Sequence, residues 1–593
     1  MLRTLTGFSS LGRIKIYLVQ LRGKDIKNAD KLCIFVHMIQ VFCKNTGTSK
    51  SFREGTTLLD MLPVFSFDRP YPIVSARVNN VSQGLKFRVY NSRDIEFLDC
   101  TSPSGMRVYI RSLSFLLCKA TRDVFRGSRL FIEHPISHGY YCDLVKADKK
   151  PVTQEDIDKI KARMQQLVDK DMAFHRYEVQ TQEAIRIFKE KGLDDKVKLL
   201  ETSGEVYTNY YTLGRTTDYY YGRLVPSAGW LKVFDLKLYH KGMLLVGPSK
   251  HNPLELAPYV DQPKTFAMFS ENIKWNNIMG LRTVGDLNHA LLDCGGSDFI
   301  QIAEALQEKK IVQMAEEIEK RYRSRSKVRL VLITGPSSSG KTTVSKRLSI
   351  QLKACGLRPL TFSTDDYFVD REKTPRLPDG SYDFDNFETV DHKALEKDLL
   401  KLMAGEEVQV PYFNFVTGKR EYGHRKYKLG PQNIIILEGI HALNPKLTKK
   451  IPDNRKYRIF ISTLTGIPLD NHNCIPTSDN RLLRRIVRDC NKGAFSARET
   501  ISQWPKVRAA EDEWIYPFQE QADVMFNSAY LVEFAVLRNH AEPILRSVPK
   551  NCPEYSEAHR LLKFIHYFTP VPDNEIPPTS LLREFVGGSS FKY

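Results

Sequence analysis

Apolar residues in the second half of the chain form three short runs with the composition of buried β-strands. The runs span residues 328–334, 360–363 and 434–437. After the first run, apolar residues recur at helical spacing, at Val344, Leu348, Leu352 and Cys355. Buried strands that alternate with amphipathic helices predict an α/β domain built on a parallel sheet.

The rest of the chain shows other patterns. Alternating apolar runs in residues 76–99, after a strand-like stretch at 34–43, predict a small β-rich module. Residues 298–322 carry apolar side chains at helical spacing among many Glu and Lys residues, which predicts a long amphipathic helix. A length of 593 residues suggests three or four domains, so we expect a multidomain α/β protein.

The most specific motif lies between the first apolar run and its helix. Residues 335–342 read GPSSSGKT, the G-x-x-x-x-G-K-T pattern of a phosphate-binding P-loop in its expected strand–loop–helix context. Backbone N–H groups of such a loop and the helix N-terminus bind a phosphate chain. We expect Lys341 to reach the outer phosphates and the Thr342 hydroxyl to bind Mg²⁺. The predicted nucleotide-binding residues are Gly335, Pro336, Ser337, Ser338, Ser339, Gly340, Lys341, Thr342 and Thr343.

Carboxylates follow the other two strand-like runs. Asp365 comes just after residues 360–363, and Glu438 comes directly after residues 434–437. Ligands of open α/β sheets bind at the carboxyl ends of the strands, so both acids should lie beside the P-loop. Thr342, Asp365 and Glu438 are therefore the predicted metal site, and Asp365 is also a candidate general base.

Arginines form a stripe on one face of a predicted helix at residues 479–490. Their spacing is i, i+3, i+4 and i+7, at positions Arg481, Arg484, Arg485 and Arg488. Taken alone, such a stripe is typical of a solvated helix face. Because it follows a complete nucleotide site, it favours arginines that neutralise the charge of a transferring phosphoryl group.

Together these residues resemble the uridine kinase and phosphoribulokinase family of P-loop kinases over residues 327–540. The resemblance rests on five stretches: GPSSSGKTT, STDDYF, YDFDNFETVD, LEGI and DNRLLRRIVRD. It implies ATP and Mg²⁺ as cofactors. It also implies an enzyme that transfers the γ-phosphoryl group to a hydroxyl of a small metabolite, with a uridine- or cytidine-type nucleoside as the first candidate.

The same resemblance implies roles for single residues. Asp365 matches the base and metal ligand, Glu438 the second metal-binding acid, and Asp385 the acid that holds sugar hydroxyls. The four arginines match a lid helix. The expected catalytic residues are Lys341, Asp365, Arg484 and Arg485, and the expected substrate-binding residues are Asp385, Phe413, Arg481 and Arg488.

The sequence departs from the uridine-cytidine kinase pattern in the segment 410–420. Phe413 stands where those kinases have a Tyr, and Gly418 stands where they have a His. Neither residue can donate a side-chain hydrogen bond to a pyrimidine, and a site without polar partners discriminates weakly for a polar base. We therefore expect phosphoryl transfer, with uridine and cytidine as mediocre acceptors.

The N-terminal half contains the stretches EGTTLLDML, RSLSFLLCKATRDVF, ISHGYYCDL, EDIDKIKARMQQLVDKDMAFHRYEV and TDYYYGRLVPSAG. On these stretches it resembles parts of threonyl-tRNA synthetases. Residues 31–102 are similar to the β-grasp TGS domain, and residues 103–262 are similar to the α+β editing domain. The editing family uses an H-x-x-x-H pair and a C-x-x-x-H pair. The four corresponding positions here are Arg111, Phe115, Tyr220 and Leu224. The resemblance thus implies a degenerate domain that has neither a Zn²⁺ site nor hydrolase activity.

A second histidine and cysteine group lies outside those positions. His134, His138 and Cys142 show metal-like spacing around Gly139, in a predicted strand and turn. We interpret them as structural or surface residues rather than as metal ligands.

The net charge of +19 allows two kinds of partner, nucleic acid or phosphate-rich small ligands. The alternative function is an RNA-binding, translation-linked protein whose P-loop domain is a nucleotide switch, with RNA contact through the N-terminal half. A third class, a trans-editing hydrolase, is disfavoured by the missing ligands. The sequence is compatible with an oligomer and does not specify the number of subunits.

The remaining segments complete the predicted domain plan. Residues 1–30 are a leader with a basic start, 263–326 a helical linker, and 541–593 a C-terminal extension. No run approaches the ~20 apolar residues of a membrane span. Ten cysteines without a C-x-x-C pair suggest a reducing compartment. We expect a cytoplasmic protein, with mitochondrial import of the basic leader as the alternative.

Overall fold

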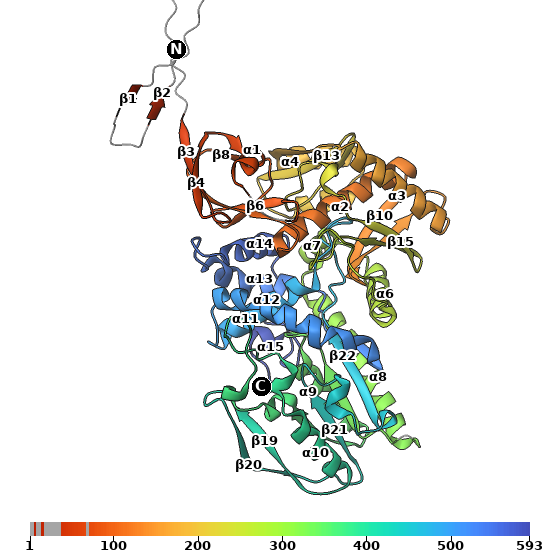
Figure 1. The fold of residues 1–593 in the computed structure, drawn as a ribbon. Helices are drawn as coiled ribbons and strands as arrows, with labels where there is room; N and C mark the ends of the chain where they lie inside the picture. The colour runs from red at the N-terminus through yellow and green to blue at the C-terminus, as the bar shows by residue number, and fades with distance from the viewer. Residues whose placement is uncertain (1–4, 8–13, 17–36, 67–69, 326) are drawn as a thin grey trace, which may run out of the picture.

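The computed structural model describes residues 5–7, 14–16, 37–66, 70–325 and 327–593 (Figure 1). The predicted leader and presequence therefore lie largely outside the described residues. Within them, β1 (Leu5–Gly7) pairs with β2 (Ile14–Ile16) in antiparallel orientation. No helix of the described part is long and apolar enough to cross a membrane.

Residues 38–98 form a five-stranded sheet with the order β4-β3-β9-β6-β7. The strands are β3 (Met38–Cys43), β4 (Thr48–Arg53), β6 (Ser75–Val78), β7 (Val81–Gln83) and β9 (Arg93–Leu98). Alternate residues of β3 are buried, which places Ile39 and Val41 in a core with Ile95 and Phe97. Short α1 (Leu58–Met61) and the pair β5 (Thr56–Thr57) and β8 (Arg88–Val89) complete this unit.

The next unit has two antiparallel sheets with helices packed on them. Its four-stranded sheet has the order β10-β11-β16-β15, and its three-stranded sheet the order β12-β13-β14. The strands are β10 (Arg129–Ile136), β11 (Gly139–Val145), β12 (Phe174–Gln180), β13 (Tyr207–Leu213), β14 (Thr216–Asp218), β15 (Asp235–Tyr239) and β16 (Gly242–Val246). The helices are α2 (Pro103–Val124), α3 (Gln154–Asp169), α4 (Thr181–Glu190) and α5 (Asp194–Glu201). The apolar faces of α2 and α3 share one core with these strands.

Three helices follow: α6 (Pro263–Ile278), α7 (Val284–Cys294) and α8 (Ser297–Arg323). The predicted long amphipathic helix is present as α8. The segment 263–326 was predicted as a helical linker, but α8 is part of the C-terminal fold. Its residues Ile311, Met314 and Ile318 pack in one core with the strands and helix that flank the P-loop. The helix thus covers one face of the following sheet.

The C-terminal half is built on a parallel sheet with the order β18-β21-β17-β22-β23. The strands are β17 (Leu330–Thr334), β18 (Arg358–Ser363), β21 (Asn433–Glu438), β22 (Lys456–Ser462) and β23 (Val524–Asn527). The predicted α/β fold class with a parallel sheet is confirmed. All five residues of the central strand β17 are buried, as expected for a strand covered on both faces.

Helices and one hairpin surround this sheet. The helices are α9 (Lys341–Ala354), α10 (His392–Met403), α11 (Thr477–Asn491), α12 (Ala497–Trp514) and α13 (Glu533–Arg546). The antiparallel hairpin of β19 (Val408–Asn414) and β20 (Lys419–Tyr427) projects at the end farthest from the N-terminal sheets (Figure 1).

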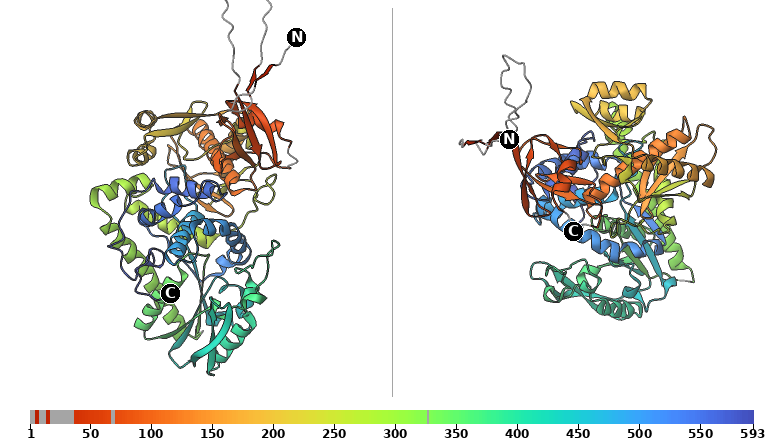
Figure 2. Two further views of the ribbon diagram at one scale, coloured as in Figure 1. Left: turned by 90° about the vertical axis from the view of Figure 1, so that its left-hand side faces the viewer. Right: turned by 45° about the horizontal axis from the view of Figure 1, so that its top comes forward.

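The C-terminal helices lie between the two halves (Figures 1 and 2). α14 (Tyr555–Ile565) contacts β7 as well as α12 and α13, and α15 (Arg583–Val586) contacts α11. Residues from α4, α5 and α7 share one hydrophobic core with residues from α11 to α15. The C-terminal extension is thus a packed part of both halves.

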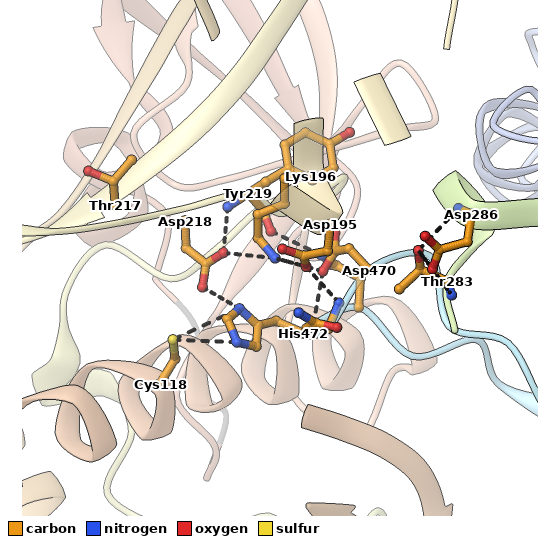
Figure 3. Close-up of polar contacts among 12 residues, drawn as sticks. Cys118, Asp195, Lys196, Thr217, Asp218, Tyr219, Thr283, Asp286, Asp470 and His472 are labelled. Atoms are coloured by element: carbon orange, nitrogen blue, oxygen red, sulfur yellow. Dashed lines mark hydrogen bonds and ion pairs between the residues drawn. The ribbon is translucent and has the colours of Figure 1, made fainter. Parts of the chain in front are cut away.

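A loop of the C-terminal half also enters the N-terminal half. The Ile132 N–H donates to the Asn471 carbonyl over 2.8 Å. Beside it, Lys196 is fully buried among Asp195, Asp218 and Asp470 (Figure 3). Such a buried network ties the halves together, because removing one partner leaves another charge uncompensated.

Candidate functional site

The P-loop connects the buried strand β17 to helix α9. A Cβ atom at Gly335 would lie 2.3 Å from the Ile461 carbonyl oxygen, so the first glycine is required by close packing. Gly340 has a φ of 84°, a conformation that glycine adopts without strain. The hydroxyls of Ser338 and Ser339 are buried without a hydrogen-bond partner among the described residues. This loop therefore has polar groups free for a phosphate ligand.

The predicted metal-site residues come together at the carboxyl ends of the strands. The Thr342 hydroxyl donates to the Glu438 carboxylate over 3.3 Å. Burial, followed by repulsion from Asp365, raises the pKa of Glu438 to about 7. Burial also raises the pKa of Asp365, and the charge of Lys341 opposes this shift. Two acids that repel each other beside a hydroxyl form a site that a divalent cation would stabilise.

Lys341 lies within this group of acids. Burial lowers its pKa, although Glu438, Glu584 and Asp365 act in the opposite direction. Its ammonium group donates to the Pro336 carbonyl over 3.2 Å. The lysine is thus held back on the P-loop, at the place from which it would reach a phosphate.

The position of Glu438 depends on the glycine that follows it. A Cβ atom at Gly439 would lie 1.8 Å from the Thr364 hydroxyl oxygen. Thr364 begins the short 3₁₀ helix that carries Asp365. The Glu-Gly pair in the sequence therefore lets the ends of β21 and β18 approach closely enough for the two carboxylates to interact.

Asp385 lies at the same site. Burial raises its pKa to about 6, Arg485 lowers it, and Glu511, Asp383 and Asp365 raise it further. Asp385 is thus close enough to Asp365, the predicted base, and to Arg485 for their charges to change its pKa.

The arginine helix α11 packs directly on the P-loop. The guanidinium groups of Arg481 and Arg485 donate over 3.1 Å to the carbonyl and hydroxyl of Ser337, and Arg484 donates over 3.4 Å to the Ser338 carbonyl. Arg488 instead pairs with its neighbour Asp489 and does not contact the P-loop. Three of the four predicted arginines therefore reach the candidate site.

Two of these arginines are buried and paired with acids, whereas the arginines of a solvated stripe would be exposed. Arg481 and Arg484 are 1% and 0% exposed. Arg481 is paired with Glu511 of α12, and Arg484 with Glu533 of α13. The spacing rule places all four side chains on one face, but it cannot show which distant helix covers that face or which acids it supplies.

Two acids that the sequence analysis missed bind the P-loop amides. The Ser337 N–H donates to Glu511 over 2.9 Å, and the Thr343 N–H donates to Glu584 over 3.3 Å. The Thr343 hydroxyl also contacts Glu584, over 2.5 Å, and the Tyr593 hydroxyl, over 2.8 Å. No local pattern marks these residues, since they lie about 170 to 250 positions away in the chain.

The hairpin residues that depart from the nucleoside-kinase pattern lie against the segment that follows Asp365. Phe413 packs on Phe368, which ends the Asp365 helix, at 5.5 Å between ring centroids, and on Phe415 at 5.1 Å. Gly418 has a φ of 70°, and a Cβ atom there would lie 2.8 Å from the Arg371 side chain. A histidine at position 418 would therefore strain the turn.

Three of the four positions that match the editing ligands carry ring or aliphatic side chains, and the fourth carries Arg111. Phe115 and Tyr220 are buried with ring centroids 5.4 Å apart, and Leu224 is buried in the same core. Arg111 donates to the Arg223 carbonyl over 2.8 Å. These residues fill the space with rings and an aliphatic side chain.

His134, His138 and Cys142 occupy separate environments. His134 is buried and stacked on Phe269, and burial lowers its pKa to about 3. His138 lies in the turn, where its Nδ1 is 2.9 Å from the Pro258 carbonyl oxygen, and Cys142 is fully buried. Among the described residues, the group with metal-ligand spacing is instead Cys118, Asp218 and His472.

In that group, His472 and Asp218 form an ion pair at the junction of the halves, and Cys118 lies beside the histidine (Figure 3). His472 Nδ1 lies 2.7 Å from Asp218, and Cys118 Sγ lies 3.8 Å from His472 Nε2. Burial lowers the pKa of His472, but Asp218 outweighs burial and the pKa rises to about 10. The contact of His472 with Asp218 joins a loop of the C-terminal half to β14, so the geometry fits a structural role.

The comparisons with known proteins match the two halves of the chain to different groups of proteins. Residues 330–534 match the model of the Phosphoribulokinase / Uridine kinase family. The C-terminal half is therefore similar to kinases of this family over these residues. Among solved structures, a possible uridine kinase from Bacillus stearothermophilus is 21% identical, with a TM-score of 0.26, over 37% of this chain and 98% of that chain. D-glycerate 3-kinase from Cryptococcus neoformans is 18% identical, with a TM-score of 0.20, over 45% of this chain and 89% of that chain.

The N-terminal half matches threonine–tRNA ligases. The relative from Caldanaerobacter subterraneus is 26% identical over 219 residues, which are 37% of this chain and 34% of the ligase. The relative from Syntrophotalea carbinolica is 31% identical over 201 residues, which are 34% of this chain and 31% of the ligase. The chain thus spans about a third of the length of the curated relatives it matches.

Proposed function

We propose that the C-terminal half is an ATP- and Mg²⁺-dependent kinase that phosphorylates a hydroxyl of a small metabolite. The observation that carries this proposal is the convergence of Lys341, Asp365 and the Thr342–Glu438 pair at the ends of three neighbouring parallel strands. P-loop phosphotransferases need these groups together, because catalysis depends on positioning and on neutralising phosphate charge.

The residues fit both cofactors. Thr342, Glu438 and Asp365 would hold the metal, and the P-loop amides and Lys341 would hold the phosphates. Bound Mg²⁺ neutralises charge on the phosphates and on the acids around it. Asp365 is the candidate base for the acceptor hydroxyl, and Asp385 is the candidate partner for further hydroxyls. Both acids accept protons more readily than exposed carboxylates, because burial raises both pKa values.

The acceptor is proposed to be rich in hydroxyls, with uridine and cytidine as poor members of its class. Phe413 offers a ring and no donor, and its place beside Phe368 gives an apolar wall to the acceptor side. Two missing hydrogen bonds cost on the order of 10²-fold in specificity.

The test is a screen of ATP consumption and product formation with nucleosides, sugars and sugar phosphates. We expect one hydroxyl-rich acceptor to be phosphorylated, with activity reduced on the order of 10²-fold or more in Lys341→Ala. Phe413→Tyr is the informative specificity variant, since it adds a hydroxyl in place, whereas Gly418→His would distort the turn. Uridine turnover at roughly 10⁴ M⁻¹s⁻¹ or above would refute the acceptor assignment.

The alternative nucleotide switch makes a different prediction in the same assay. An RNA-binding switch would hydrolyse ATP when RNA is added and would phosphorylate no acceptor. RNA-stimulated hydrolysis without a phosphorylated product would therefore replace the kinase assignment.

A further inference from the structure

A cavity of about 380 Å³ lies where the N-terminal sheets meet the C-terminal helix α14. Its walls come from β7, α2, β12, β13, the segment 219–223 and α14. Its volume is within the range of small-molecule sites. The cavity is remote in sequence from the P-loop motifs, and the proposed kinase chemistry does not use it.

The lining of this cavity is strongly basic. Six of its residues are arginine or lysine and one is acidic, namely Arg107, Arg111, Arg176, Arg223, Arg560, Lys563 and Glu205. Arg107 and Arg560 are neutralised by Glu557, and Arg560 also by Asp479. The others come from four different elements and converge on one space.

Three of these cations have no acidic partner. Across the described ranges, no carboxylate lies within ion-pair distance of Arg111, Arg223 or Lys563. Burial, together with Arg176, lowers the pKa of Arg223. Desolvation, together with Arg223, lowers the pKa of Lys563. The protein therefore holds like charges together at an electrostatic cost that a bound anion would relieve.

Arg111, at one of the positions that match the editing ligands, is held in place by its neighbours. A Cβ atom at Gly222 would lie 2.4 Å from the Arg111 guanidinium carbon. That guanidinium also lies 5.1 Å from the centre of the Tyr221 ring. Arg111 is packed against Gly222 and the Tyr221 ring and hydrogen-bonded to the Arg223 carbonyl. Its remaining N–H donors can therefore bind a ligand at little cost in side-chain entropy.

Polar groups without a hydrogen-bond partner on the cavity wall are a second sign that a ligand binds here. Buried oxygens of Gln83 and Asn209 and the Tyr220 hydroxyl have no hydrogen-bond partner among the described residues. All three residues line the cavity. Buried polar groups are normally satisfied, so three orphans around one space indicate a missing polar ligand.

We propose that this cavity binds a small organic phosphate. The anionic group would lie against Arg111, Arg223 and Lys563, and a hydroxyl- or amide-bearing portion would satisfy the orphaned oxygens. Arginine recognises phosphate through paired N–H donors, and the tyrosines of the wall supply apolar contact to the remainder of the ligand.

The test uses the full-length chain carrying Lys341→Ala, so that binding at the P-loop is suppressed. Inorganic phosphate, ribose 5-phosphate, adenosine 5′-monophosphate and adenosine are titrated by calorimetry, together with a single-stranded RNA dodecamer. We expect at least one of the small phosphates to bind and adenosine not to bind. Arg223→Gln and Lys563→Gln should each weaken that binding about tenfold, and Lys563→Arg should retain it.

Lys241→Gln is the matched control, since it removes an exposed lysine from the β15–β16 turn, away from the cavity lining. It should leave the affinity unchanged. In the chain with Lys341 intact, Lys563→Gln should leave phosphoryl transfer unchanged, which separates this site from the kinase site. Failure of all three small phosphates to bind, or binding that both cavity variants leave intact, would overturn the proposal. Binding of the RNA alone would overturn the small-molecule assignment.

Discussion

The two basic sites of this protein balance their charge in opposite ways. At the P-loop, the buried Arg481 and Arg484 are each paired with a glutamate from another helix. In the N-terminal cavity, Arg111, Arg223 and Lys563 have no acidic partner within the described residues. The difference shows that basic sequence content alone does not locate an anion site, because the pairing acids decide which cations are free.

The burial of the two sets accounts for this difference. A fully buried cation needs a counter-charge within the protein, because an unpaired buried ion is strongly destabilising. The cavity cations are half-buried or exposed, so leaving them unpaired costs less than leaving a fully buried ion unpaired. They can remain unpaired in the free protein and gain a partner when a ligand enters. The following predictions test this comparison through stability, pH and binding.

The largest effect is expected from breaking a buried pair at the P-loop. Glu533→Gln would leave the Arg484 cation fully buried without its counter-charge, so the free energy of unfolding should fall by about 3–5 kcal/mol. The control is Glu542→Gln on the same helix, which removes a partly exposed partner of Arg538, Arg546 and His566 and should cost about 0–1 kcal/mol. Denaturant melts measure both. Equal costs for the two variants would mean that the pairing of Arg484 does not depend on burial.

The free energy of unfolding of the metal-free protein should depend on pH through Glu438. The pKa of Glu438 is raised to about 7, so the native state binds its proton more tightly than the unfolded state. This group should therefore lower the stability of the metal-free protein as pH rises from about 4.5 to about 7.

Glu438→Gln removes this titration. The variant should be more stable than the wild type at pH 7.5, by on the order of 1–3 kcal/mol, and the difference should shrink towards pH 4.5. Thermal melts at several pH values measure it, and Mg²⁺ with ATP should reduce it by stabilising the charged form. A difference that does not change with pH would contradict the assigned cause.

The sequence predicted which residues meet at the P-loop better than it predicted what surrounds them. The P-loop, Asp365 and Glu438 were found because each follows a strand directly, and parallel strands bring their ends together. The apolar runs likewise predicted the parallel sheet, and the long helical pattern predicted α8. These are short-range signals, carried within one element and its flanking loop.

The partners of the arginine helix were not predictable in this way. Glu511, Glu533 and Glu584 lie in helices whose own sequences give no sign of what they contact. Their pairing depends on how α12, α13 and α15 pack against α11 and the P-loop, which is a property of the assembled fold. The basic cavity was missed for the same reason, since its cations come from separate elements.

A smaller effect is expected from the carboxylate at the start of α9. Glu584 accepts hydrogen bonds from the Thr343 amide and hydroxyl, and this amide belongs to the backbone that we expect to bind the phosphates. Glu584→Gln removes a negative charge that competes with the nucleotide, so ATP should bind about 3–10-fold more tightly. Glu575→Gln is the control, because Glu575 is exposed in the same C-terminal segment. Calorimetry measures both, and unchanged or weaker ATP binding by Glu584→Gln would show that this contact does not compete.

The smallest effect concerns the free cations of the cavity. Lys563 has a folded-state pKa below its ordinary value, so its charge is disfavoured in the native state at neutral pH. Lys563→Gln should therefore leave the free energy of unfolding unchanged or raise it, within about 0.5 kcal/mol, because the lysine is exposed to the cavity. Inorganic phosphate at millimolar concentration should stabilise the wild type more than the variant, which reverses their order of stability. The same measurement on Lys241→Gln should show no such reversal. A clear loss of stability in Lys563→Gln without phosphate would mean that this cation already has a stabilising partner, and the contrast between the two sites would then fail at the residue on which it depends most.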